Sequence, residues 1–387
     1  MKVLKVLLAG LVSIVLVLSL ILAVSPYLRR CLFLQAPSVY DYDELPNKTI
    51  EKSVKPFHFD TADMTIDFDS LGMKYNNKEV GDMQSFLESH GTTAFIIIRD
   101  GKIFYEKYLN GHSRDSYCKA FSMTKSVLSF LIGIAIDEGL ITDVNDKIMK
   151  YIPEFKGQYA EQLTLLHCLN YQTGLHYTKG KTPWSDRTRM LYTTNVRKLL
   201  LGVKFIEEPG ASFSSHEYAN LIAAFSLERA IGTTITEYLQ NKLFDKIGME
   251  YGALINIDSH KHGFEKMESG LTARAIDFAK IGRLVLTKGL WKGEQVVPKQ
   301  WIKSLFVPAE GNKWDHYIKY MWWGAKRDTG IHDVYANGHF GQRIYVSPTA
   351  NMVVVRMGYK TGGISWARFI RTLVDRIMSH PEQSKLQ

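Results

Sequence analysis

The most constraining feature of the sequence is a helix that is apolar on nearly every side. Residues 122–138 carry apolar side chains at positions 127, 128, 130–132 and 134–136, and Gly139 follows them. A helix without a polar face is buried all round, and glycine commonly ends a helix. The chain must therefore build its core around this segment.

Strand patterns lie on both sides of that helix. Residues 93–98 and 103–105 are β-branched or aromatic runs around Asp100-Gly101, which predicts a β-hairpin. Strand-like runs return at 334–335, 342–346 and 352–357, before an amphipathic helix at 364–378. Between them, residues 140 to about 265 are mainly helical, with helices expected at 218–231 and 234–247, and another helix follows at 270–286. This order predicts an α+β fold: one antiparallel sheet built from both chain ends and flanked by helices, with an inserted all-helical region.

The N-terminus has the pattern of a membrane segment. Residues 6–24 contain no charge, and the next charged residue is Arg29. Nineteen helical residues approach the roughly 30 Å thickness of the hydrocarbon core, although a cleaved signal remains an alternative. We expect an anchor or signal at 1–31, a linker at 32–60 and a catalytic domain at 61–380. The domain is then membrane-anchored and extracytoplasmic or periplasmic, or secreted if the segment is cleaved.

Composition narrows the choice of partners. The net charge is +9, but no Lys/Arg-rich run with interleaved aromatics occurs, so nucleic-acid binding is not indicated. The three cysteines, Cys31, Cys118 and Cys168, form no C-x-x-C pair, and a single disulfide is all that they allow. The sequence implies no metal or cofactor, and it leaves the oligomeric state open.

The sequence Ser122-Met123-Thr124-Lys125 opens the apolar helix and fits S-x-x-K. Residues i and i+3 share a helix face, so Lys125 lies beside the Ser122 hydroxyl. At the helix start the Ser122 amide is free to donate to an oxyanion. A second match, Ser116 to Lys119, lies upstream in a polar stretch, so we expect Ser122 to be the nucleophile.

Two weaker motifs follow. Tyr218-Ala219-Asn220 is a Y-x-N triplet in the helical middle, and three other Y-x-N triplets occur elsewhere. His339-Phe340-Gly341 is the only H-x-G and precedes a strand. Either motif alone is more often structural than catalytic.

Together the three motifs resemble those of the serine β-lactamase and penicillin-binding superfamily, in the order S-x-x-K, Y-x-N and K-T-G. The resemblance spans roughly residues 90–375, including a helix at 163–175 that ends in a T-G-L turn, Glu208-Pro209-Gly210, and Gly270-Leu271-Thr272-Ala273. Residues 337–348, with Met321-Trp322-Trp323-Gly324 before them, resemble most the 6-aminohexanoate-dimer hydrolases, alongside class C β-lactamases and related esterases.

This resemblance implies a serine hydrolase that cleaves amides or esters of small substrates through an acyl-enzyme on Ser122. Lys125 and Tyr218 would form a coupled acid/base pair. The Ser122 and Gln342 amides would form the oxyanion hole, and Asn220, His339 and Gly341 would position the substrate.

One departure from the family pattern bears on the substrate. His339 stands where β-lactamases carry the K-T-G lysine, which weakens recognition of a substrate carboxylate. Arg343 or Lys326 could replace that cation, and Trp314, Trp322 and Trp323 could line an apolar cleft. The alternatives are a D-Ala-D-Ala peptidase or β-lactamase, and a binding or sensor domain that acylates without turnover.

Overall fold

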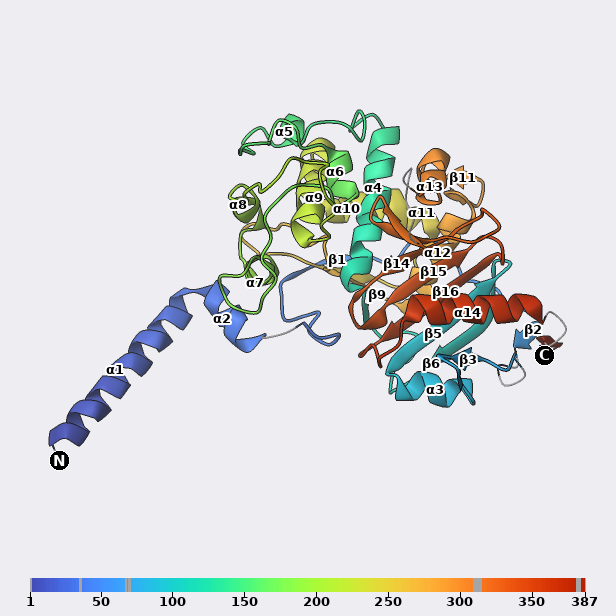
Figure 1. Cartoon of the computed structure of the whole chain (residues 1–387), viewed down its shortest axis with the longest axis horizontal. Coiled ribbons are helices and arrows are strands. Elements are labelled where there is room, and N and C mark those ends of the chain that lie inside the picture. Colours follow the sequence, from blue (N-terminus) through green and yellow to red (C-terminus); the bar gives the residue numbers. More distant parts are fainter. Residues whose placement is uncertain are drawn as a thin grey trace.

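A computed structural model describes residues 2–34, 37–66, 68, 71–308, 315–380 and 384–386. Helix α1 (Lys2–Val24) projects away from the rest of the chain (Figure 1). Its apolar side chains, such as Leu4 and Leu7, are mostly exposed. Helix α2 (Pro26–Phe33) follows at once and contacts helix α7 (Asp186–Tyr192).

The predicted sheet is confirmed. Within the described residues seven strands pair antiparallel in the order β12-β13-β14-β15-β16-β5-β6. The hairpin strands β5 and β6 thus form one edge, and the C-terminal strands supply the rest. Their bounds are β5 Thr92–Arg99, β6 Lys102–Tyr108, β12 His316–Lys319, β13 Trp322–Ala325, β14 Asp333–Asn337, β15 Arg343–Ser347 and β16 Met352–Gly358.

Both faces of the sheet are covered, which explains the uninterrupted apolar run of β5 (Figure 1). Ile96 and Ile98 join the core that contains helix α4 (Thr124–Asp137) and helix α12 (Ala275–Leu286). Phe95 and Ile97 point the other way, into the core beneath helix α14 (Trp366–Ser379).

The helical middle is present, with shorter helices than the sequence suggested. The Thr234 capping box is confirmed, but the helix expected at 234–247 contains a π-helical turn, η3 (Gln240–Phe244). Helix α9 (Glu217–Ile231) contacts α4 and lies at the centre of this region. The other helices are α5 Ile148–Tyr151, α6 Leu165–Leu169, α8 Val196–Leu200, α10 Ile235–Leu239 and α11 Asp245–Ile247.

Two expectations about the middle of the chain were wrong. Strand β8 (Ala253–Asn256) interrupts the region expected to be all-helical, and strand β9 (Leu271–Ala273) replaces the first turn of the helix expected at 270–286. The two strands pair with each other in a second sheet, of order β1-β8-β9-β7. Short apolar runs do not by themselves distinguish a strand from a helix end.

The segment expected to be a linker at 32–60 is also packed against the domain. Strand β1 (Asn47–Ile50) pairs with β8, and Asp41 forms an ion pair with Lys119 in strand β7 (Cys118–Lys119). These are contacts between distant parts of the chain, which composition does not reveal.

The remaining elements are short helices, strands and turns. They are α3 Met83–Ser89, α13 Lys299–Leu305, β2 Met64–Ile66, β3 Lys74–Tyr75, β4 Lys78–Glu79, β10 Leu290–Trp291, β11 Glu294–Gln295, β17 Ser384–Leu386 and the short turns η2 Phe121–Met123 and η4 His339–Gly341. The three cysteines are all free thiols.

The exposed apolar surface of α1 leads to a prediction. We expect the full-length protein to sediment with membranes and to need detergent for release, because this surface is unfavourable in water. Cell fractionation followed by N-terminal sequencing checks it. A soluble form whose mature N-terminus lies at Ser25 or beyond would show that the segment is a cleaved signal.

Candidate active site

Ser122 lies at a constrained turn that opens the buried helix. Phe121 before it has a φ of 47°, a left-handed conformation that is uncommon for a bulky side chain. The turn is tied to β9, because the Ala120 amide donates to the Leu271 carbonyl (2.9 Å) and the Leu271 amide donates to the Thr124 hydroxyl (3.2 Å). The sheet therefore fixes the position of the serine.

Lys125 lies one turn further along and is almost entirely buried, with 7% of its surface exposed. Its ammonium lies over the ring of Tyr171, 5.8 Å from the centroid. The Asn220 amide donates to the Tyr171 hydroxyl over 3.1 Å. Asn220 is fully buried and lines no part of the Ser122 pocket. Its contact places it behind Tyr171 and indirectly behind Lys125.

The third motif forms the opposite side of the site. Phe340 is left-handed (φ 57°), and its carbonyl accepts a 2.5 Å hydrogen bond from the buried Arg356 guanidinium. Gly341 has a φ of +83°, and a Cβ there would meet the Trp366 ring at 2.4 Å, so glycine is required. The loop is thus held rigidly beside Ser122.

Gln342 follows this loop and is buried. Its side chain bonds both backbone groups of Gly358, at 2.7 and 2.8 Å, which ties the loop to β16. Its own backbone amide donates to the His339 carbonyl over a long 3.3 Å. The oxyanion role expected for this amide stays a prediction.

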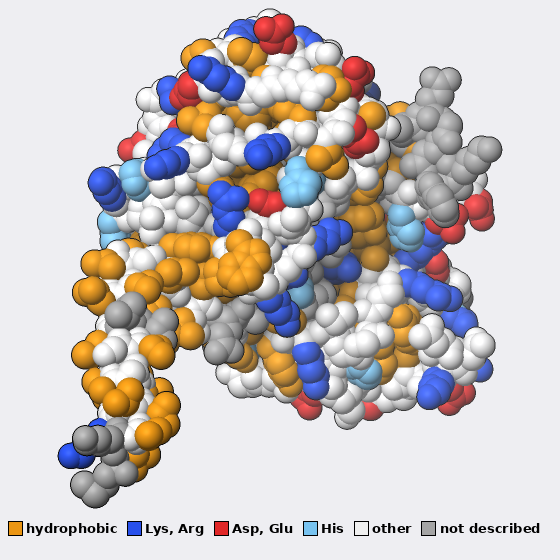
Figure 2. All heavy atoms as spheres, turned by 60° about the vertical axis from the view of Figure 1, so that its left-hand side comes forward, with side chains coloured by type: hydrophobic (Ala, Val, Ile, Leu, Met, Phe, Trp, Pro, Cys, Tyr) orange, Lys and Arg blue, Asp and Glu red, His pale blue; other side chains and the backbone are white. Residues whose placement is uncertain are grey.

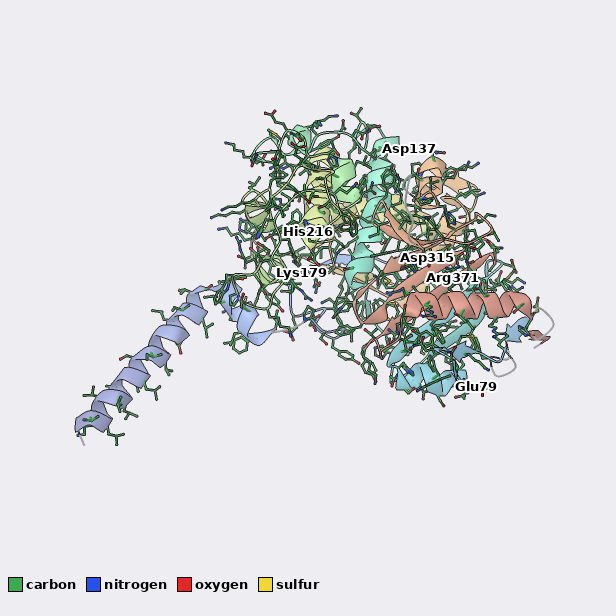
Figure 3. The ribbon with its side chains drawn as sticks, viewed as in Figure 1. Glu79, Asp137, Lys179, His216, Asp315 and Arg371 are labelled. Atoms are coloured by element: carbon green, nitrogen blue, oxygen red, sulfur yellow. The ribbon has the colours of Figure 1, made fainter. Side chains whose placement is uncertain are left out.

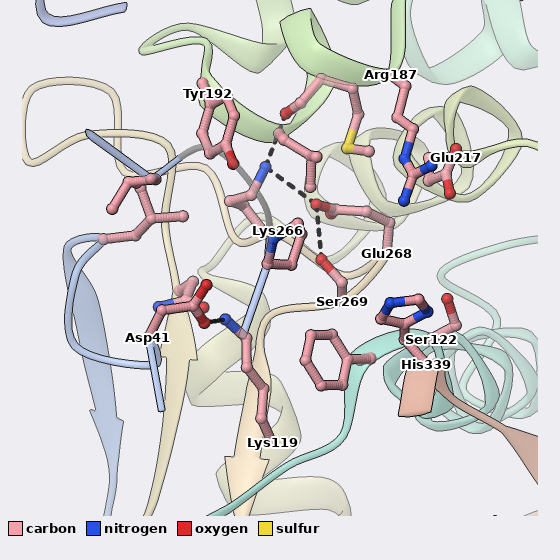
Figure 4. Close-up of a pocket in the computed structure, with 17 residues that line it drawn as sticks. Asp41, Lys119, Ser122, Arg187, Tyr192, Glu217, Lys266, Glu268, Ser269 and His339 are labelled. Atoms are coloured by element: carbon pink, nitrogen blue, oxygen red, sulfur yellow. Dashed lines mark hydrogen bonds and ion pairs between the residues drawn. The ribbon is translucent and has the colours of Figure 1, made fainter. Parts of the chain in front are cut away.

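A pocket opens directly at Ser122 (Figure 4). Its walls come from the segment after α2, from the Ser122 turn, from α7, from the start of α9, from the residues before β9 and from the third motif. The lining residues are Leu34, Pro37, Asp41, Leu45, Lys119, Phe121, Ser122, Arg187, Met190, Leu191, Tyr192, Glu217, Asn256, Lys266, Glu268, Ser269 and His339.

Glu217 lines the pocket and was missed by sequence analysis, and the charges of Lys125 and Arg187 both act on its carboxylate. Its carboxylate accepts a 2.5 Å hydrogen bond from the Tyr177 hydroxyl. Burial raises the pKa of Glu217, but the charge of Lys125, the Tyr177 hydrogen bond and the charge of Arg187 together hold it below its usual value. The pocket therefore contains an ionised carboxylate coupled to the lysine of the S-x-x-K motif.

The structure does not form the expected pair between Lys125 and Tyr218. The Tyr218 hydroxyl donates to Asp186 over 2.8 Å, and Tyr218 lines a neighbouring hollow instead of the Ser122 pocket. Burial and the Asp186 carboxylate raise the pKa of Tyr218, which disfavours a phenolate. The reason is geometric: successive helix residues point about 100° apart, so Glu217 faces the pocket where Tyr218 does not.

Three cationic side chains line the pocket, and they differ in whether an acidic residue pairs with them. Lys119 is paired with Asp41, and the buried Lys266 is paired with Glu268 at 3.0 Å (Figure 4). Within the described part of the chain, no carboxylate forms an ion pair with Arg187. Burial and the Arg187 charge lower the pKa of His339, so its imidazole is neutral at neutral pH.

The other expected contributors lie elsewhere. Arg343 is turned to Asn337 and to the Gln342 carbonyl, so it does not replace the missing lysine. Trp322 is fully buried and stacks on Phe130, and Trp323 stacks on Tyr335. These two tryptophans therefore do not line the Ser122 pocket. Trp314 lies outside the described residues.

Comparison with known proteins agrees with the architecture. The Beta-lactamase family model matches residues 83–373, and the chain belongs to this family. Its enzymatic class is that of a hydrolase, as the family and the following relative both indicate. The 6-aminohexanoate-dimer hydrolase of Paenarthrobacter ureafaciens is 26% identical over 302 residues, which cover 71% of this chain and 74% of that protein.

Solved structures show the same fold. A candidate 6-aminohexanoate-dimer hydrolase from Bacillus anthracis superposes with a TM-score of 0.79 at 20% identity, covering 90% of this chain and 94% of the other. A class C β-lactamase mutant gives a TM-score of 0.60 at 12% identity, covering 77% and 95%. The predicted fold class and family are thereby confirmed.

Proposed function

We propose that this protein hydrolyses amide or ester bonds of small substrates through an acyl-enzyme on Ser122. The observation that carries the proposal is the placement of Ser122: it opens a buried helix, has Lys125 one turn behind it and faces a pocket closed by the third motif. The likeness to a 6-aminohexanoate-dimer hydrolase supports cleavage of a linear amide.

In the proposed reaction Lys125 first passes a proton to the coupled Glu217 carboxylate, and the neutral amine then takes the Ser122 proton as the Ser122 oxygen attacks the substrate carbonyl. Collapse of the tetrahedral adduct breaks the amide or ester bond, and the proton goes to the departing amine or alcohol. Water then attacks the Ser122 ester and gives a proton to the same base, which passes it to the departing Ser122 oxygen as the carboxylic acid is released. Two donors are proposed for the oxyanion, the amides of Ser122 and Gln342.

In this proposal Glu217 has the role of partner to Lys125 that was expected of Tyr218. Its ionised carboxylate interacts with the charge of Lys125, so the protonation states of the two groups are coupled during the reaction. Tyr177 orients the carboxylate by its hydrogen bond. Tyr218 instead holds Asp186, the first residue of the helix that carries Arg187.

We expect a short linear amide or p-nitrophenyl ester to be turned over with a higher kcat/KM than nitrocefin. A neutral His339 attracts a substrate carboxylate less strongly than the lysine of β-lactamases does. Parallel assays on one preparation check this. A preference of about tenfold or more for nitrocefin, about 1.4 kcal/mol in transition-state binding, would make the substrate assignment wrong and leave Ser122 in place.

Arg187 keeps one alternative open. An exposed guanidinium in the pocket wall could bind a carboxylate bidentately, as a β-lactamase or D-Ala-D-Ala peptidase requires. Arg187→Ala distinguishes the two cases. It should raise KM sharply for substrates with a carboxylate if this alternative holds, and should spare neutral esters.

We also propose that α1 is retained as a membrane anchor, with the catalytic domain on the extracytoplasmic side. The docking of α2 supports retention. The Arg30 guanidinium donates to the carbonyls of Tyr192, Thr193 and Asp258, at 3.3, 3.3 and 2.7 Å, so the chain is fixed to the domain directly after α1.

A further inference from the structure

The segment that leaves the anchor helix contributes directly to the catalytic pocket. Leu34 and Pro37 line the pocket, and Leu34 lies ten residues beyond Val24, the last residue of α1. Eight of these ten residues form α2 and rise about 1.5 Å each, and the other two add at most about 3.5 Å each, so this wall lies at most roughly 20 Å from the end of the apolar span. The headgroup region beyond the hydrocarbon core is several ångströms thick on each side. The pocket is therefore close to the lipid headgroups.

The domain surface beside α2 has the composition of a membrane interface. The segment 179–189 contacts α2 through the hydroxyl of Tyr27, which donates to the Pro183 carbonyl. Next to Pro183, Trp184 is 77% exposed, and Phe33 on α2 is 72% exposed. Exposed aromatics of this size are typical where one end of a protein meets lipid.

The charges of the segment 179–189 also favour contact with a lipid bilayer. Lys179, Lys181, Arg187 and Arg189 are all exposed, and the one acidic residue among them, Asp186, is buried, accepts a hydrogen bond from Tyr218 and forms an ion pair with Arg189 at 3.6 Å, which leaves a net positive segment. Lys179 lies on the side of the domain that faces α2 (Figure 3). Basic residues beside a membrane span bind anionic headgroups, at about 1 kcal/mol each.

The apolar surface also continues from the anchor onto the domain. Figure 2 shows hydrophobic side chains along α1 and again where the helix meets the domain, with basic side chains around them. Inside the pocket, Leu34, Leu45, Met190 and Leu191 form the apolar part of the wall, beside charged side chains such as Lys266 and Glu268. Such a wall suits an alkyl or acyl chain.

We propose that α2 and the segment 179–189 rest on the bilayer surface, so that the Ser122 pocket opens at the headgroup layer and takes amides or esters of membrane-borne amphiphiles. This inference rests on the hydrolase function proposed above and names its substrate class. The apolar chain of the substrate enters along the Leu34 wall while the scissile carbonyl reaches Ser122.

A fluorescence experiment tests the contact without relying on activity. The full-length protein is reconstituted in vesicles of phosphatidylcholine and phosphatidylglycerol in equal parts, with and without brominated acyl chains that quench tryptophan. Trp184→Phe is expected to remove most of the quenching, and Trp291→Phe, which removes a buried tryptophan, is expected to preserve it. Quenching that is unchanged by Trp184→Phe would overturn the proposed contact.

An activity experiment tests the substrate class with the same vesicles. Lys179→Glu combined with Lys181→Glu is expected to lower turnover of a long-chain p-nitrophenyl ester in the vesicles by about tenfold, and to leave a soluble short-chain ester within about twofold. The matched control reverses the exposed Lys299 and Lys303 of α13 and should change neither. Equal effects on both esters would overturn the proposal. If the unaltered protein turned over neither ester, the hydrolase function would be wrong, whereas the quenching result would still decide the contact.

Discussion

Replacing Ser122 by alanine is expected to lower kcat by at least about a thousandfold, because the acyl-enzyme can no longer form. Ser122 is the only serine of the S-x-x-K motifs that lines the pocket among the described residues. The measurement is steady-state hydrolysis of a p-nitrophenyl ester, with circular dichroism to verify the fold.

The matched control is Ser116→Ala. The Ser116 hydroxyl accepts a hydrogen bond from the Ser113 amide (2.9 Å) in a turn outside the pocket. This variant should retain activity within about twofold, since only a local turn is altered. Full activity of Ser122→Ala, or a collapse of activity in Ser116→Ala alone, would reverse the assignment of the nucleophile.

Lys125→Ala and Glu217→Gln are each expected to lower kcat by about a hundredfold or more, and the double variant is expected to be hardly worse than the poorer single one. Groups that act as one unit lose their shared function with the first substitution. Glutamine keeps the size of Glu217 and an acceptor for Tyr177 but removes the charge. Kinetics of the full cycle of variants measures the coupling.

Tyr218→Phe separates this account from the expectation based on sequence. If Tyr218 only holds Asp186, its loss should cost less than about tenfold in kcat. A loss as large as that of Lys125→Ala would restore Tyr218 as the partner of Lys125. Losses of Lys125→Ala and Glu217→Gln that multiply strictly would argue against a coupled pair.

Local patterns predicted the fold well because they reflect burial directly. The apolar helix, the hairpin at Asp100-Gly101 and the closing helix all occur where periodicity and turn residues put them. Gly139, with a φ of 73°, ends its helix as expected of a C-terminal glycine. The strands β8 and β9 were not predicted, because each has four residues or fewer and depends on pairing with distant segments.

The site was only partly predictable from sequence. Spacing on one helix determines that Ser122 and Lys125 share a face, so that part needed no tertiary information. The Y-x-N triplet does not determine which side of its helix faces the site. A shift of one residue at the start of α9 decides whether Tyr218 or Glu217 faces the Ser122 pocket. The one sequence signal for Glu217 was its position directly before the Y-x-N triplet. Leu34 and Arg187 reach the pocket through packing between distant segments, which no local pattern encodes.

The most direct test of the central claim is the position of the covalent adduct. The full-length protein is treated with a fluorophosphonate probe or a slowly hydrolysed ester, and intact mass followed by peptide mapping locates the label. We predict one adduct per chain, on Ser122, which is lost in Ser122→Ala. An adduct on Ser116 or another residue, or labelling that persists in Ser122→Ala, would contradict the account.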